Sequence, residues 1–231
     1  DIEGSIANDF RNIDFKTLIN CSDLLESLNI VKYVLLTRKF DVYFSHKPLY
    51  APDYSGSHLT ELSMHIYEES LLVFIVTNCK YLHTLRMYCG PIPSRIESPA
   101  VHALHHLRHS SVEVLHIYDY VDPQASACLQ QLHGAHLVEL RLVLVNYVTN
   151  GCVLDLVATL PALRVIGIYA APRVKSSIVL SLLNNYPNLR SLTFKNAYQS
   201  DSGESSLIMK LLVQQWYPHV KHFDVGPYEQ S

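Results

Sequence analysis

Histidine is the residue type in this chain whose chemistry first suggests a site. The chain has thirteen histidines, and four of them lie within one short segment: His102, His105, His106 and His109. On an α-helix, residues four positions apart share a face, so His102 and His106, or His105 and His109, would present two imidazoles to one zinc ion. No HExxH motif is present, and no third ligand is suggested. The alternative is a solvated helix face opposite Val101, Leu104 and Leu107, and we predict no metal site.

Other catalytic signatures are missing from the sequence. The closest two of the eight glycines, Gly151 and Gly167, are 16 residues apart, which excludes the clustered glycines of a GxGxxG turn or a GxxxxGK[ST] loop. There is no GxSxG elbow, and nothing nominates a Ser-His-Asp or Cys-His set. We therefore predict a protein that is not an enzyme, with no catalytic residue and no cofactor.

Composition narrows the class of protein further. The 231 residues are 48% apolar and 17% charged, with a net charge of -3, so the chain is neither disordered nor a general polyanion binder. Its five cysteines are odd in number and form no CxxC, which indicates reduced, buried thiols inside the cell, in cytoplasm or nucleus. The longest apolar run, from Leu71 to Val76, is too short to span a bilayer, so we expect no membrane partner.

The dominant signal is a six-residue pattern in which the first, fourth and sixth residues are apolar. Clear copies are Leu82–Met87, Leu137–Leu142 and Leu189–Phe194. Nine copies follow one another, with first residues at positions 10, 30, 59, 82, 112, 137, 163, 189 and 220. One such pattern is uninformative in an apolar chain, but nine at steps of 20 to 31 residues indicate a repeat architecture.

The segments between copies have a helical period. Leu154, Val157 and Leu160, for example, lie three positions apart and share one helix face. Each unit is a strand, a turn and a helix that cannot bury its apolar face alone, and parallel stacking gives one continuous core. We predict an α/β fold with a parallel inner sheet, helices on the convex side and about nine repeats. One domain covers residues 1–231, and the start at Asp1 suggests a fragment of a longer chain.

This arrangement resembles the leucine-rich repeat family over essentially the whole chain. Its steps are most similar to the ribonuclease-inhibitor-like class, including the repeats of F-box proteins, and Asn78–Leu82 and Tyr186–Leu189 are close to the lead-in of that class. The resemblance implies a right-handed solenoid. The asparagine or cysteine ladder of the family survives only in fragments, at Cys89, Asn146 and Asn196. No F-box helix motif is evident, so a ubiquitin-ligase role would require an upstream segment.

The repeat also predicts a binding surface. If positions 1, 4 and 6 of each copy point into the core, positions 3, 5 and 7 form columns on the other face of the sheet. Tyrosine and arginine gather in these columns in the central copies, and both are enriched at interaction hot spots. We predict that a partner binds seven of these residues: Arg86, Tyr88, His116, Tyr118, Glu139, Arg141 and Tyr169. The alternative is a solvated face with scattered aromatic residues.

Three functions fit these observations. The first is a protein–protein interaction module that binds its partner on the concave sheet, as the substrate-recognition part of a ubiquitin-ligase adaptor or as a subunit of a larger assembly. The second is an RNA-binding leucine-rich repeat domain of an export or processing factor, which would use the same arginines and tyrosines. The third is a structural spacer between domains.

The remaining expectations concern stability, loops and ends. Truncating an inward residue such as Leu115 or Leu140 should cost about 2–5 kcal/mol, whereas changing the outward His116 should cost far less. Ser45–Ser57 and Tyr198–Ser206 are expected to be long loops. Because the last copy has no obvious polar cap, a further domain or subunit is expected at the terminal repeat.

Overall fold

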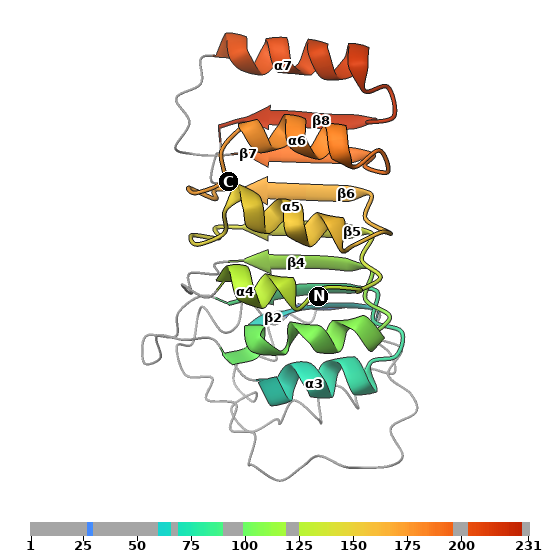
Figure 1. The fold of residues 1–231 in the computed structure, drawn as a ribbon. Helices are drawn as coiled ribbons and strands as arrows, with labels where there is room; N and C mark the ends of the chain where they lie inside the picture. Colours follow the sequence, from blue (N-terminus) through green and yellow to red (C-terminus); the bar gives the residue numbers. More distant parts are fainter. Residues whose placement is uncertain are drawn as a thin grey trace, which may run out of the picture.

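The computed structural model describes residues 27–29, 60–65, 69–89, 99–118, 125–195 and 203–227. Within them, eight parallel strands form one sheet in chain order (Figure 1). The strands are β1 Ser27–Asn29, β2 Glu61–His65, β3 Thr84–Tyr88, β4 Val114–Tyr118, β5 Glu139–Val143, β6 Val165–Tyr169, β7 Ser191–Lys195 and β8 His222–Gly226. The predicted α/β fold with a parallel sheet is confirmed.

A helix precedes each strand from β3 to β8 and packs in a second layer beside the sheet (Figure 1). The helices are α3 Glu69–Asn78, η3 Pro99–His109, α4 Ala125–Gln130, α5 Asn150–Ala158, α6 Ser177–Asn185 and α7 Gly203–Trp216. None of the helices in the described ranges has the length and the apolar character that a membrane span requires. Because α7 begins at Gly203, the end of the segment expected to be a loop, Tyr198–Ser206, is helical instead.

Seven copies of the sequence pattern have the predicted frame. The third to seventh residues of the copies that start at 59, 82, 112, 137, 163, 189 and 220 are strands β2 to β8. The strands pair in the same frame, so that Leu85 is opposite Leu115, Leu115 opposite Leu140, and Leu140 opposite Ile166. Equivalent residues of successive copies therefore lie side by side across the sheet.

The second copy is the exception. Its predicted start at Ile30 would place the strand at residues 32–36, but β1 is Ser27–Asn29 and pairs Leu28 with Leu62. This register selects the frame Leu25-Glu-Ser-Leu28-Asn-Ile30, which also fits the apolar pattern and lies five residues earlier. The predicted start was wrong because two overlapping frames fit the pattern and only strand pairing distinguishes them. The first copy, at Phe10–Phe15, lies outside the described residues, as do Cys21, Ser45–Ser57 and Asn196.

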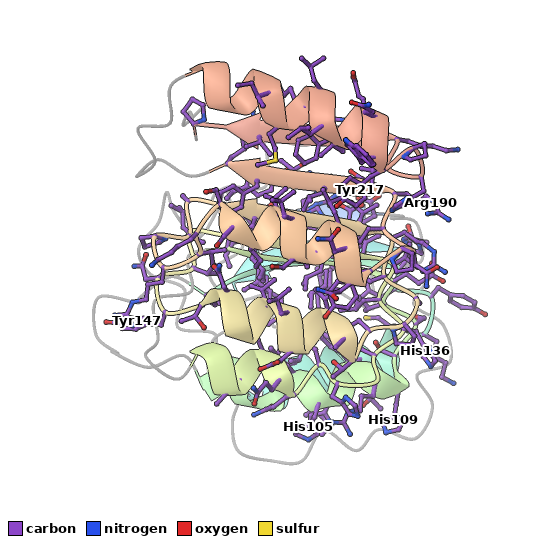
Figure 2. All side chains as sticks on the ribbon, turned by 45° about the horizontal axis from the view of Figure 1, so that its top comes forward. His105, His109, His136, Tyr147, Arg190 and Tyr217 are labelled. Atoms are coloured by element: carbon purple, nitrogen blue, oxygen red, sulfur yellow. The ribbon has the colours of Figure 1, made fainter. Side chains whose placement is uncertain are left out.

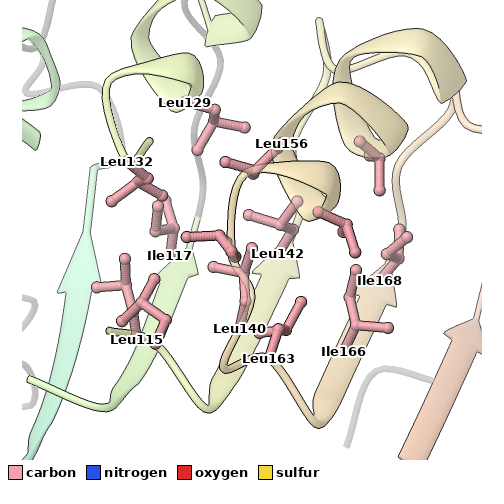
Figure 3. Close-up of a cluster of buried hydrophobic side chains, with 14 of the residues drawn as sticks. Leu115, Ile117, Leu129, Leu132, Leu140, Leu142, Leu156, Leu163, Ile166 and Ile168 are labelled. Carbon is pink, nitrogen blue, oxygen red and sulfur yellow. The ribbon is translucent and has the colours of Figure 1, made fainter. Parts of the chain in front are cut away.

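The core lies between the sheet and the helices (Figure 3). Leu140 and Leu142 of β5 are buried against Leu156 of α5, and the same layer continues through Leu115 and Ile117 of β4. Each strand thus sends alternate side chains toward the helices, as the pattern predicts. The four described cysteines are buried thiols of this core: Cys79, Cys89, Cys128 and Cys152.

The segment with four histidines is a 3-10 helix, η3, rather than an α-helix. Its apolar residues are three positions apart, and a 3-10 helix has three residues per turn, so Leu104 and Leu107 lie on one buried stripe. Residues four apart are then about a third of a turn from sharing a face. The α-helical spacing that would place His105 and His109 on one face therefore does not apply, and both side chains are exposed on the outside of the molecule (Figure 2).

Hydrogen bonds at equivalent positions join neighbouring modules. The residue after β5 and the residue after β6, Leu144 and Ala170, both have positive φ angles, of 57° and 49°. Their amides donate to the carbonyls of Tyr169 and Lys195 on the next strand at 2.9 Å and 2.7 Å. In the helix layer, the Tyr186 hydroxyl donates to the Leu154 carbonyl of the preceding helix at 2.8 Å.

Of the predicted ladder fragments, Cys89 is buried whereas Asn146 is exposed, so Asn146 is not part of a buried ladder.

Candidate functional site

The seven predicted partner-binding residues all lie on four adjacent strands, β3 to β6. Residues that alternate with the buried ones face away from the described helices, and we call this side the open face of the sheet. The register places Arg86 opposite His116 and His116 opposite Arg141, while Tyr88 is opposite Tyr118. We call the seven residues the central patch: Arg86, Tyr88, His116, Tyr118, Glu139, Arg141 and Tyr169.

Two groups of aromatic contacts form one edge of the central patch. The rings of Tyr88 and Tyr118 are stacked, with centroids 4.4 Å apart and planes 5° from parallel. Two strands further, the ring of Tyr169 lies over Gly167, where an added Cβ would come within 2.7 Å of it. The glycine thus makes room for the tyrosine ring, and all three tyrosines are only partly exposed. They form a fixed, partly apolar surface with hydroxyl groups.

Glu139 connects two of the basic side chains of the patch, His116 and Arg141. Its Oε1 accepts a hydrogen bond from His116 Nε2 at 2.9 Å and one from Arg141 Nε at 2.6 Å. The His116 side chain is 8% exposed and the Glu139 side chain 19%, so solvent screens these bonds little. The expectation that changing His116 costs far less than truncating Leu140 stays a prediction. His116 does lie on the open face, but neighbouring long side chains bury it there.

The protonation state of His116 follows from this environment. Burial lowers the pKa of His116, the hydrogen bond to Glu139 raises it, and the positive charge of Arg141 lowers it again, with a net lowering from 6.5. At neutral pH the imidazole is therefore uncharged and carries one proton. Because the carboxylate can only accept, that proton is on Nε2, and Nδ1 accepts from the Tyr118 hydroxyl at 3.4 Å.

Tyr118, His116 and Glu139 are hydrogen-bonded in the order of a nucleophile, a base and an orienting acid. The pKa of Tyr118 nevertheless disfavours nucleophilic chemistry. Burial and the neighbouring Tyr88 raise the pKa of the Tyr118 hydroxyl above 10.0. An activated nucleophile requires the opposite shift, toward an easily lost proton. These hydrogen bonds are better suited to holding Tyr118 and Arg141 in fixed positions.

The formal charges of the central patch are balanced when Glu61 of β2, which lies beside it, is counted. Arg86 Nη1 lies 3.1 Å from Glu61 Oε2, and Arg141 bonds to Glu139, so two arginines face two glutamates. Neither Glu61 nor Gly167 was in the predicted site, although both fall in its columns. The signal that identifies Glu61 is an acid at position 3 of one copy beside a base at position 5 of the next.

Histidines on the helix layer do not assemble a metal site in the part of the chain that is described, where no three His, Cys, Asp or Glu side chains gather around one point. The rings of His105 and His106 lie 4.0 Å apart, and His105 Nδ1 is 3.5 Å from Gln131 Oε1. The side chain of His102 lies outside the described set.

Comparison with known proteins gives no family. No protein-family model matches the chain, and no curated protein is significantly similar to it.

Proposed function

We propose that the chain is a leucine-rich-repeat-like solenoid of about nine repeats, and that its central patch binds a protein partner without catalysing a reaction. The observation that carries this proposal is the convergence of the central patch on β3 to β6, with partly exposed tyrosines on a sheet whose neighbouring strands hold them rigidly. Aromatic side chains fixed in this way lose little conformational entropy on binding. A right-handed solenoid with a concave sheet is the form that the resemblance to leucine-rich repeats implies.

A protein is the favoured partner because the charges of the patch are already paired. Binding to a nucleic acid draws its affinity from cations that neutralise phosphates and release counterions. Arg86 and Arg141 each have a carboxylate partner within 3.1 Å, so a polyanion would have to compete with Glu61 and Glu139. A protein surface with apolar groups around one hydrogen-bonding group would instead contact the tyrosines and the Arg141 side chain, which is 41% exposed.

The resemblance to F-box-type repeats supports a more specific role, in which the chain recognises the substrate of a ubiquitin-ligase adaptor or serves as a subunit of a larger intracellular assembly. In that role the protein works in cytoplasm or nucleus. A spacer without a binding function would have no need of a paired and stacked surface. The proposal therefore predicts that loss of the patch removes a partner.

The test compares two triple variants in affinity purification followed by mass spectrometry. The first variant carries Arg86→Ala, Tyr118→Ala and Arg141→Ala in the central patch. The matched control carries Arg164→Ala, Arg190→Ala and Tyr81→Ala, the same residue types at sites outside the patch. We expect the first variant to lose a protein that both the wild type and the control retain, while circular dichroism shows both variants folded.

Two results would contradict the proposal. One is a folded patch variant that captures every partner of the wild type. The other is retention of single-stranded RNA by the purified wild type with a steep salt dependence that the patch variant lacks, which would favour RNA as the ligand.

A further inference from the structure

Three basic residues form a row at the edge of the sheet where the strands begin. Arg164, Arg190 and Lys221 directly precede β6, β7 and β8, the last being the strand of the last described module. Their backbones are neighbours, because Arg190 N donates to Arg164 O at 2.7 Å and Lys221 N donates to Arg190 O at 2.8 Å. Neighbouring strands lie about 4.8 Å apart, so the row is about 10 Å long. We call these three residues the basic edge.

One short sequence builds the basic edge three times. It consists of a proline, any residue, an apolar residue and the base, and its copies are Pro161–Arg164, Pro187–Arg190 and Pro218–Lys221. In the first two copies, Nη1 of the arginine donates to the carbonyls of the proline and of the apolar residue, at 2.9 to 3.4 Å. Equivalent bonds thus hold both guanidinium groups. In the described part of the chain, Nε and Nη2 of both groups have no acceptor.

Charge pairing separates the basic edge from the open face. Three cations of the open face each have a carboxylate within 3.1 Å: Arg86, Arg141 and Lys195. No described carboxylate pairs with a residue of the basic edge. Asp and Glu are also absent from the segments that lead into its strands, residues 158–165, 184–191 and 214–223. Arg190 and Lys221 are exposed, and Figure 2 shows Arg190 on the side of the molecule opposite Tyr147. Positive charge therefore remains available here for a ligand.

The same row also shows where the positive charge stops. The residue before β5 is Val138, and the residue before β4 is Glu113, whose carboxylate lies 3.3 Å from His83 Nε2. A ligand that continued along the row would therefore meet an uncharged and then an acidic side chain. Typical nucleic-acid binding uses about six to ten phosphate contacts, and typical lipid-binding clusters have about four to eight basic residues. Three cations in a short row match a short acidic segment of a protein better than either.

We propose that the basic edge binds an acidic α-helix of a partner protein, whose carboxylates at positions i, i+4 and i+7 pair with Arg164, Arg190 and Lys221. Helix side chains three or four positions apart are separated by about 5–6 Å. Positions i to i+7 span about 10.5 Å along the helix axis, which is close to the length of the row. In an extended strand, three side chains of one face would span about 13 Å and overshoot the row. Each carboxylate can accept two parallel bonds from the Nε and Nη2 of an arginine.

The basic edge is separate from the central patch, because its residues precede β6 to β8 whereas the patch lies within β3 to β6. The control chain with Arg164→Ala, Arg190→Ala and Tyr81→Ala is expected to lose the acidic helix and to keep the partner of the central patch. Failure of either proposal therefore leaves the other unaffected.

The test measures the binding of model helices to the full chain by fluorescence anisotropy at low ionic strength, where exposed charges are little screened. The probe is a labelled alanine-rich peptide of about twenty residues, long enough to be helical, with Glu at positions i, i+4 and i+7. Its control has the same composition, with the three glutamates on different sides of the helix. We expect the aligned peptide to bind at least about tenfold more tightly than the control peptide.

Two charge reversals locate the contact. Arg190→Glu, at the centre of the row, should weaken binding of the aligned peptide at least about tenfold. Lys175→Glu makes the same change in net charge at an exposed lysine before α6 and should leave binding nearly unchanged. A peptide with Lys at position i+4 should bind Arg190→Glu more tightly than it binds the wild type. Thermal melts would verify that both variants fold, so loss of the Arg190 bonds to the loop carbonyls cannot by itself produce this pattern.

Three results would overturn the proposal. The first is a wild-type chain that binds the aligned peptide no better than its control. The second is an equal loss of binding in Arg190→Glu and Lys175→Glu, which would reduce the effect to net charge. The third is tighter binding of a single-stranded uridine oligonucleotide, or of vesicles containing phosphatidylserine, that Arg190→Glu abolishes. That result would make a nucleic acid or a membrane surface the ligand of the basic edge.

Discussion

The central patch and the terminal module are built from the same repeat and have opposite surfaces. In the centre, modules on both sides bury Leu115 and Leu140, and the polar residues of the open face bond to one another. At the last described module, Phe223 of β8 is only partly buried, and Ile208, Leu211 and Trp216 of α7 are exposed. Residues of the same type at the same place in the repeat are therefore buried between two modules and exposed where only one neighbouring module is described.

The largest expected difference is between equivalent core positions. Leu140→Ala should lower the free energy of unfolding by about 2–5 kcal/mol, because neighbouring strands and α5 leave little room for the cavity to close. Phe223→Ala removes a larger side chain from the equivalent position of β8 but should cost less, since Phe223 is partly exposed. Urea denaturation of the two variants and the wild type would measure both costs. Equal or reversed costs would contradict the comparison.

The second largest difference in stability is expected between the ion pairs of the central patch and those of the last described module. Glu139→Ala leaves Arg141 and the buried His116 without their shared acceptor and should destabilise by about 1–3 kcal/mol. Asp224→Ala removes the acceptor of Lys195 and Lys210 at the terminal module, where both partners of the closer pair are about a third exposed. Its expected cost is below about 1 kcal/mol. The same denaturation experiment checks the order, and a larger loss for Asp224→Ala would reverse our interpretation.

Acidification should affect the centre through His116. Its pKa is lower in the folded chain than the ordinary value of 6.5, so the unfolded chain binds the proton more readily. Its contribution to stability is therefore full above pH 6.5 and is lost as pH falls toward the folded pKa, with a slope of at most about 1.4 kcal/mol per pH unit.

Four groups face this imidazole and enter the measurement: Glu139, Arg141, Arg86 and Tyr118. His116→Asn should flatten the profile of unfolding free energy against pH between 7 and 5 relative to the wild type, whereas exposed His136→Asn serves as the control. A wild-type contribution that grows on acidification would show that Glu139 binds a charged imidazole instead.

The smallest expected difference concerns two glycines. Gly167→Ala brings a methyl group within 2.7 Å of the Tyr169 ring and 3.2 Å of Arg141 Cγ, so the ring must move, at a cost of about 1 kcal/mol. Gly226→Ala in β8 meets nothing within 4 Å and should change stability little. Thermal melts would compare the two, and partner capture should weaken only for Gly167→Ala. Equal capture by both variants would exclude Tyr169 from the binding surface.

Much of this fold could be predicted because the positions of the apolar residues determine which side of each strand faces the helices. In β2 to β8 an apolar residue at positions 4 and 6 faces the helices, and a one-residue slip would expose it, so the pattern determines the frame. At β1 two frames share Ile30, and the pattern cannot choose between them. At η3, which histidines share a face depends on whether a helical turn has 3.0 or 3.6 residues. Apolar residues spaced three apart are compatible with both helix types.

The candidate site was predictable at the level of columns but not of contacts. Register alone brings Arg86, His116 and Arg141 into one row, and the columns of the sequence contain them. That Glu139 binds both His116 and Arg141, and that His116 is buried between them, depends on side-chain rotamers that a linear pattern does not contain. The exposure of Trp216 could not be predicted either, because the same apolar spacing produces a buried face in α6.

The most direct test of the central claim is site-specific photo-crosslinking in cells of the native source. A benzoyl-phenylalanine side chain would replace Tyr118 in the central patch or, as the control, Tyr81, which is 58% exposed outside it. The account predicts one or more discrete protein adducts from position 118 that are absent from position 81. Identical adducts from both positions, or an adduct to RNA alone at position 118, would contradict it.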